Sequence, residues 1–304
     1  MDGPEALNIV GWRPEKGRPR SVTDGDAERV ALQGDGFGFG VMRSIKWLAF
    51  GVAVGALFVA ERLRPLRARR EPGVERVARN LAIGLLAAAT TAASELPIVA
   101  PAAKLVERRR IGVLQWLRLP RAPRIVLGFL LLDYTLYLWH WLNHRVPFLW
   151  RYHAVHHIDL DLDSTTGLRF HFGELALAAG FRAAQVLLLG VDRDTLRLWQ
   201  QMLLLSVVFH HSNLDLPIEV ERGLVRLVVT PRMHGIHHSM RPDETDSNYS
   251  SLLSWWDRLH RSLRLNVPQS AVIIGVDGFL RRDAVTLERS LTLPFRPDGP
   301  AVLH

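Results

Sequence analysis

The sequence predicts an all-α integral membrane protein, with about four to five membrane-associated helices and a helical and loop-rich cap that carries a cluster of histidines. Long apolar runs alternate with arginine-rich segments over residues 45–211, the pattern of membrane helices joined by basic loops. Of the 13 histidines, 11 lie between His140 and His238. Residues 212–304 are polar, with one β-like run at 271–276, and predict a water-facing cap.

The composition of the chain indicates which partners it contacts and excludes several kinds of metal site. The chain has 304 residues, 48% of them hydrophobic, and a sequence pI near 10.6. Because the basic residues lie between the apolar runs, the charge favours contact with anionic lipid, and no nucleic-acid partner is expected. The chain has no cysteine, which excludes disulfides, iron–sulfur clusters and thiolate-bound haem. Any metal must therefore be held by nitrogen and oxygen.

The N-terminal residues differ from the rest. Residues 1–41 are rich in Gly, Pro and charge without an apolar period, and we expect them to be a disordered extension. Met42 precedes a basic residue and the first apolar run, so we take it as the expected native start. Residues 42–295 are expected to form one domain, and residues 296–304 a C-terminal tail.

The apolar runs predict the individual helices. A first run at 45–60 is short for a span, and the second, at 81–105, contains Pro97, which predicts a kink or a re-entrant hairpin. The third run is 125–141. Two further runs, 173–190 and 195–211, predict a hairpin whose two ends face the same side. Seven basic residues on each side of the second run leave the orientation open.

The histidines form three groups. Residues at i, i+3 and i+4 share one helix face, so each group can direct its imidazoles at one point. Neutral imidazole suits iron, copper, zinc and nickel, whereas burying so many imidazoles without a metal is costly. Eight ligands exceed what one tetrahedral zinc uses and predict two metals in one pocket. The eight are His140, His144, His153, His156, His157, His234, His237 and His238.

Several other residues are candidates for the same site. Asp133 and Tyr137 lie on one helical stripe with the first histidines. Asp133 is expected either to orient a metal-bound imidazole or to make a hydrogen bond between helices, and Tyr137 to lie behind the ligands or in the packing. His171 and His211, at the two ends of the predicted hairpin, are candidates for further metal-binding or near-metal residues.

Two nearby features, His210 and a group of three aspartates, are not taken as parts of the metal site. His210 would point about 100° away from His211 on a helix, so only His211 is taken as a candidate. Asp159, Asp161 and Asp163 do not complete a calcium-binding loop, since Ser164 replaces the required Gly and Phe170 the final Glu. They are expected to be solvated turn residues.

The motifs together resemble a known family. The ordered series Asp133, Tyr137, HxxxH, HAVHH, TTGLRFHFGE, HHSN, HGIHH and SNYSSLLSWWDRL resembles the sterol desaturase/fatty acid hydroxylase superfamily over about residues 40–295. It is most similar to the branch that holds sterol methyl oxidases, sterol desaturases and alkylglycerol monooxygenase. The resemblance implies a helical membrane fold with a two-metal, usually di-iron, site at the cytosolic face.

The resemblance also implies roles for residues and partners. The family's ligands fall on the eight clustered histidines, His171 and His211 match further histidines near the metals, and Asn248 matches an Asn close to the site. Trp141 stands where the family usually has arginine, and HRS follows WWDRL where FGT is common. The implied cofactors are two irons with O2 as co-substrate, with zinc able to replace iron in purified protein. An external ferredoxin or cytochrome b5-like donor with its reductase would supply electrons.

These features give a first expectation and several alternatives. We expect an O2-dependent di-iron hydroxylase of a membrane lipid (sterol-like, fatty acyl or isoprenoid) in a bacterial inner membrane, with its active site on the cytoplasmic face. A desaturase on the same scaffold is the closest alternative. A di-zinc membrane hydrolase would need a general base, for which Glu174 is the only acid near in sequence. A metal transporter is disfavoured because most histidines lie at helix ends or in polar segments.

Overall fold

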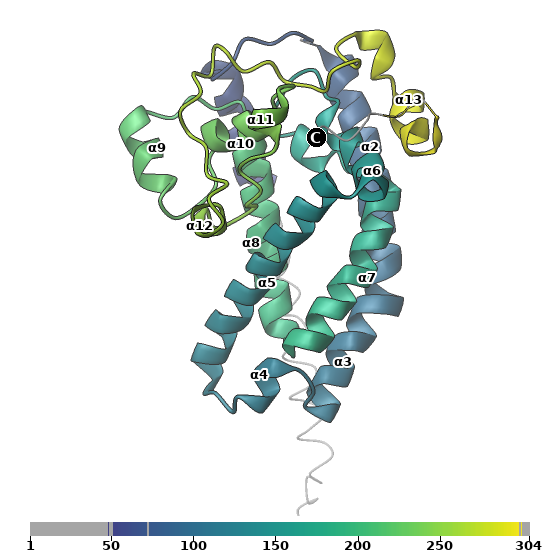
Figure 1. The fold of residues 1–304 in the computed structure, drawn as a ribbon, viewed down its shortest axis with the longest axis vertical. Coiled ribbons are helices and arrows are strands. Elements are labelled where there is room, and N and C mark those ends of the chain that lie inside the picture. Colours follow the sequence, from purple (N-terminus) through teal and green to yellow (C-terminus); the bar gives the residue numbers. More distant parts are fainter. Residues whose placement is uncertain (1–47, 49–50, 72, 298, 300–304) are drawn as a thin grey trace, which may run out of the picture. The chain divides into compact units, whose positions relative to one another are not determined.

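The computed structural model describes residues 48, 51–71, 73–297 and 299. The chain divides into two units, residues 1–53 and 54–304. In the first unit Leu48 and residues 51–53 are helical, whereas the predicted disordered extension and the proposed start at Met42 lie outside the described residues. The second unit contains the helices of Figure 1 and all the candidate site residues.

The second unit is helical, as predicted. After a helical segment at residues 54–63 come α2 (Val74–Ser94), a π-helical turn η1 (Glu95–Val99), α3 (Ala100–Arg109), α4 (Val113–Trp116) and α5 (Arg121–Arg145). Then follow α6 (Pro147–His157), α7 (Phe172–Leu189) and α8 (Arg193–His211). Within the described residues, three helical stretches are long and apolar enough to cross a membrane, namely Val74–Trp116, Arg121–Arg145 and Phe172–Leu189. The predicted all-α membrane fold is confirmed.

The interruption at Pro97 does not reverse the chain. Proline has no N–H to donate, and the helix absorbs this loss by widening into the π-helical turn Glu95–Val99 before α3 continues. The alternative of a re-entrant hairpin at this point is therefore wrong.

Two glycines join α3–α4 to the end of α7. Gly112 (φ 93°) precedes α4 and Gly190 (φ 75°) ends α7, and both have a left-handed backbone. A Cβ on Gly112 would lie 2.3 Å from the Gly190 Cα, so the two backbones are in direct contact. Gln115 strengthens the junction by donating from Nε2 to the Gly190 carbonyl at 2.8 Å. This contact holds the far ends of α3 and α7 together.

We expect Gly112→Ala to destabilise the protein by about 1–3 kcal/mol, because the added methyl group meets backbone that cannot rotate away. The thermal unfolding midpoint of the detergent-solubilised protein measures this effect. Gly180→Ala is the matched control, since no atom lies within 4 Å of a Cβ there. Equal midpoints for the two variants would contradict the contact.

The cap follows α8 and contains short elements. These are α9 (Ile218–Leu224), α10 (Pro231–His237), α11 (Pro242–Thr245), α12 (Trp255–Leu259) and α13 (Leu287–Thr292), with 3-10 turns η3 (Arg282–Ala284) and η4 (Leu293–Phe295); a further 3-10 turn, η2 (Thr166–Leu168), lies between α6 and α7. The β-like run at 271–276 does not form a strand, because Ile274 makes one isolated bridge, to Ser239. Long loops connect these helices above α5 and α8 (Figure 1).

A buried ionic network joins α2 to the loop after α6. Arg76 forms a bidentate pair with Asp159 at 2.9 Å, and its Nη1 donates to Asp163 at 2.6 Å. Asp161 accepts from the backbone N–H groups of Arg70 and Glu71. The three aspartates are thus buried rather than solvated, and the prediction for them was wrong. The network fixes the chain two residues after His157.

Candidate metal centre

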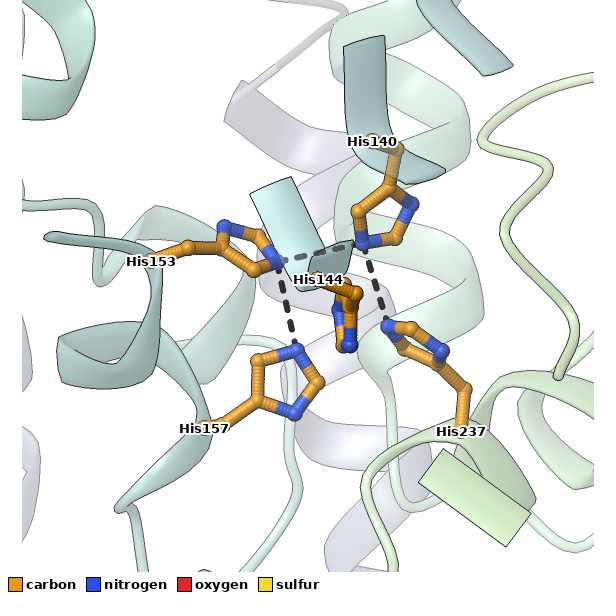
Figure 2. Close-up of side chains that lie close together, drawn as sticks. All are labelled: His140, His144, His153, His157 and His237. Atoms are coloured by element: carbon orange, nitrogen blue, oxygen red, sulfur yellow. Dashed lines mark hydrogen bonds between the residues drawn. The ribbon is translucent and has the colours of Figure 1, made fainter. Parts of the chain in front are cut away.

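Nine histidines converge in two neighbouring groups. In each group the nitrogen atoms that could bind a metal all lie within 4.8 Å of one another, and every side chain is buried. Figure 2 shows the first group, whose imidazoles point toward a common centre. The first group is His140, His144, His153, His157 and His237, and the second is His156, His211, His234 and His238.

Helical spacing distributes these side chains. α5 supplies His140 and His144, one turn apart, to the first group. α6 supplies residues to both groups, with His153 and His157 on one side and His156 on the other. α10 also serves both groups, since His237 belongs to the first group and His234 to the second. His238, which directly follows α10, belongs to the second group as well. The two groups therefore adjoin, and the rings of His157 and His238 stack at 4.3 Å.

Hydrogen bonds set the tautomers in the first group. His140 donates from Nδ1 to the Tyr249 carbonyl at 2.6 Å, and His237 from Nδ1 to the Ser247 carbonyl at 2.7 Å. His153 donates from Nδ1 to Glu174 Oε1 at 2.8 Å. Because a neutral imidazole carries one N–H, each of these rings presents an Nε2 lone pair to the centre.

These lone pairs face one another at short distance. The Nε2 of His140 lies 3.1 Å from the Nε2 of His153 and 3.1 Å from that of His237. Protonation does not relieve the repulsion, because burial lowers the pKa of His237 to about 3. The Nε2 of His144 is also buried without a hydrogen-bond partner in the described part of the chain. A cation between the rings would satisfy all four nitrogens.

The second group has the same arrangement. His211 donates from Nδ1 to the Val207 carbonyl at 2.7 Å, and His156 from Nδ1 to the Arg169 carbonyl at 3.3 Å. Their Nε2 atoms lie 2.9 Å apart, and the Nε2 of His234 is 3.0 Å from that of His211. Burial lowers the pKa of His156 well below its usual value, so this ring stays neutral. Each group thus offers an all-nitrogen pocket suited to iron, copper, zinc or nickel.

The loop 247–250 orients the first group. Its carbonyls on either side of Asn248 accept the Nδ1 protons of His237 and His140. Asn248 has a left-handed backbone (φ 54°) and donates from Nδ2 to the carbonyls of Met233 and Arg264. Asn248 thus holds the loop through backbone carbonyls.

Asp257 fixes the other half of this loop. Its carboxylate accepts the backbone N–H groups of Tyr249 at 2.9 Å and Ser250 at 3.0 Å, and the Ser262 hydroxyl at 2.6 Å. Sequence analysis missed Asp257, because these partners come together only when the chain turns after α12. A carboxylate inside the WWDRL motif was the signal that could have drawn attention to it.

Glu174 connects α7 to the first group. It accepts the His153 proton, and it lies in α7, the helix that forms one wall of the adjoining cavity. We expect Glu174→Ala to lower metal affinity about 10–100-fold, because His153 loses the acceptor that holds its tautomer. Glu174→Gln retains an acceptor oxygen and is expected to lose less. The chelator concentration that removes half the metal measures both, and equal values for Glu174→Ala and the unaltered protein would contradict the role.

Two candidates, Asp133 and Tyr137, lie away from the clustered imidazoles. Asp133 accepts from Trp256 Nε1 at 2.7 Å and Leu253 N at 3.1 Å, so it joins α5 to the cap. Of its two predicted roles, the structure therefore favours the hydrogen bond between helices over orienting an imidazole. Tyr137 hydrogen-bonds Ser262 at 3.0 Å and packs edge-on against Tyr249. It therefore lies behind the loop 247–250.

The near-metal role predicted for His171 does not fit the structure. His171 belongs to neither group, because both of its ring nitrogens are engaged elsewhere. Its Nδ1 accepts from the Gly173 N–H at 3.0 Å and caps α7, and its Nε2 donates to the Leu291 carbonyl at 3.1 Å.

His210 is a site residue that sequence analysis set aside. It is buried, its ring centroid lies 4.2 Å from that of His234, and it lines the adjoining cavity. It is not one of the four histidines of the second group, although its ring packs against His211 and His234. The His210–His211 doublet was the available signal.

An apolar cavity leads away from the histidines between α5, α7 and α8. α5 packs on α8, and α7 packs on α2 and α3 (Figure 1). Residues of α5, α7 and α8 line the cavity. The cavity holds about 190 Å³, less than a pocket that encloses a whole drug-sized ligand. It therefore suits part of a long apolar molecule. Among its lining residues are Leu136, Trp139, Phe170, Phe181, Leu203 and Val207.

Fold and site together define a class: a helical membrane protein with two adjoining histidine pockets beside an apolar cavity. Residues 125–262, which include all nine clustered histidines, match the fatty acid hydroxylase family. Over this region the chain is similar to members of the sterol desaturase/fatty acid hydroxylase superfamily.

Curated relatives share parts of the chain. The ornithine lipid hydroxylase OlsE of Rhizobium tropici is 31% identical over 187 residues, covering 61% of this chain and 53% of its own length. Mouse (Mus musculus) cholesterol 25-hydroxylase is 27% identical, covering 54% and 59%, and alkylglycerol monooxygenase of Xenopus tropicalis is 30% identical, covering 44% and 29%. The chain spans about half the length or less of these relatives. No solved structure matches it.

Proposed function

We propose that this protein is a membrane-bound lipid hydroxylase that uses O2 and two irons held by the nine clustered histidines. The observation that carries the proposal is the convergence of buried Nε2 lone pairs in two adjoining groups, which a pair of cations would satisfy. Nine nitrogen ligands exceed the set that di-zinc hydrolases use. Irons bound there would supply the activation of O2 that attack on an unactivated C–H bond requires.

The lipid nature of the proposed substrate rests on three supports. The helices α5 and α7 are apolar enough to lie in a membrane, the surface of the cavity between them is mostly apolar, and the histidine groups lie at its end. The relatives are named for hydroxylation or monooxygenation of an ornithine lipid, cholesterol and an alkylglycerol. A lipid chain can enter such a cavity from the bilayer without crossing water.

The residues of the chain then have separate tasks. Trp139 and Phe181 stack at 4.6 Å and form an apolar wall that excludes water from the substrate chain. Glu174 and the carbonyls of loop 247–250 hold the imidazole protons at Nδ1, which keeps the Nε2 atoms free to bind metal. The cap closes the histidine groups from the aqueous side.

Electrons would come from a separate protein. The chain has no cysteine for an iron–sulfur cluster, so we propose an external donor such as a ferredoxin or a cytochrome b5-like protein with its reductase. We also propose that the protein lies in a bacterial inner membrane with the cap on the cytoplasmic face, where such donors occur.

The proposal is tested by comparing lipid extracts of a host with and without the gene. Hydroxylation is expected to produce a lipid whose mass increases by one oxygen, and the product should disappear in a strain that carries His156→Ala. A lipid that has lost two hydrogens would favour the desaturase alternative instead. A purified protein that contains two zincs and releases a hydrolysed lipid would overturn the proposal.

A further inference from the structure

Arg182 is a charged residue in an apolar setting. It lies in the middle of α7, one of the membrane-length helices, and lines the cavity. Eight residues separate it from Glu174, which places the two about 12 Å apart along the helix axis. The cavity therefore has the histidine groups at one end and a guanidinium at the other.

Arg182 is half-buried, and its guanidinium lacks the partners that buried arginines of this chain have. Among the described residues Arg182 forms no ion pair, and its buried Nη1 has no hydrogen-bond partner. The guanidinium stacks on the face of Trp199, with 4.2 Å from the guanidinium carbon to the ring centroid. By contrast, Arg76 pairs with two carboxylates, and Arg169 bonds three oxygen atoms.

An unpaired guanidinium in this position carries a high free-energy cost unless a ligand pairs with it. An unpaired charge inside a membrane-spanning helix carries a large desolvation cost, and intramembrane ionisable residues commonly mark substrate sites. Stacking on Trp199 leaves the hydrogen-bonding edge of the guanidinium unused. Glu95 is close enough to influence Arg182 electrostatically, but its carboxylate accepts from Gln200 Nε2 at 3.5 Å.

We propose that Arg182 binds an anionic oxygen group, in the first instance a carboxylate, on the buried part of the lipid substrate. A carboxylate matches the planar guanidinium fork and neutralises its charge. The substrate would then be held at two points, with its anionic group at Arg182 and its reacting carbon about 12 Å away at the histidines. This inference names the substrate class of the proposed function and rests on that function only for the histidine end of the cavity.

The test compares binding of three probes of equal chain length to the purified full-length protein in phosphatidylcholine nanodiscs. Palmitic acid, palmityl alcohol and hexadecane compete against radiolabelled palmitic acid. The unaltered protein is expected to bind the acid at least about tenfold more tightly than the alcohol, as a charge-assisted hydrogen bond requires. Arg182→Gln is expected to abolish this preference, and Arg182→Lys, which keeps the charge without the fork, to retain part of it.

Glu95→Gln is the matched control. This variant removes the carboxylate whose negative charge acts on Arg182. It is expected to leave the preference for the acid intact or to increase it. Equal affinities for acid and alcohol in the unaltered protein, or a preference that survives in Arg182→Gln, would overturn the inference. If Arg182→Gln binds all probes weakly and Glu95→Gln/Arg182→Gln restores them, Arg182 only balances Glu95, and the inference is also wrong.

The experiment separates this inference from the proposed function, because probe binding is read without turnover. Loss of the acid preference in Arg182→Gln, in a protein that holds no metal pair, would support Arg182 as a lipid site and contradict the hydroxylase. A protein that holds two metals but shows no preference for the acid would support the hydroxylase and contradict the role of Arg182.

Discussion

Replacing His237 with alanine is expected to remove metal and activity together. His237 is the one histidine of the first group that comes from the cap, whereas the other members come from α5 and α6. Its loss removes a ligand and leaves the Ser247 carbonyl without its donor. Metal affinity should therefore fall by more than the roughly 10–100-fold that loss of an outer hydrogen bond costs.

Elemental analysis of the purified variant and measurement of hydroxylated lipid in its host test this prediction. His260→Ala is the matched control, because His260 belongs to neither group and stacks on Tyr137 at 4.9 Å. The control is expected to keep its metal. Full metal content in His237→Ala would show that the first group does not hold a metal through this residue.

Replacing Arg76 with alanine is expected to destabilise the protein by about 3–5 kcal/mol, the cost of leaving buried charges without their partner. Arg76 is 3% exposed and Asp159 is 0% exposed, so water cannot replace the lost hydrogen bonds. Because Asp159 lies two residues after His157, the variant should also bind metal less tightly. The free energy of unfolding in detergent measures the first effect.

Arg281→Ala is the control, because it removes an exposed ion pair instead of a buried one. The Arg281–Asp283 pair is exposed, and its removal should change stability little. Similar losses for the two variants would contradict the importance of the buried network.

The network also predicts a dependence on pH. Burial would raise the pKa of Asp159, but Arg76 and Arg169 outweigh it and hold that pKa well below its usual value. A folded-state pKa below the unfolded value of about 3.9 means that the stabilisation is present above that pH and is lost as the pH falls below it. Arg76→Ala should weaken this acid dependence.

Much of the fold followed from local patterns. Apolar runs long enough for a membrane anticipated α5 and the α7–α8 hairpin, and helical spacing anticipated that the clustered histidines share faces. Spacing could not show that α6 serves both groups. That depends on where α8 and α10 pack, which is a tertiary property.

The remaining features depend on contacts between distant residues. Asp159 looked solvated because its partner Arg76 lies 83 residues earlier in the chain. The roles of Asp257 and Arg182 depend on tertiary structure, since Asp257 acts through backbone N–H groups and Arg182 is defined by the absence of a partner among the described residues. His171 shares a motif with true candidates, yet it caps a helix.

X-ray absorption at the iron edge, together with iron analysis of the purified protein, tests the central claim most directly. Two irons per chain, each surrounded by nitrogen ligands of imidazole, would agree with the two histidine groups. Protein that is folded, purified from iron-replete cells and free of bound transition metal would contradict them.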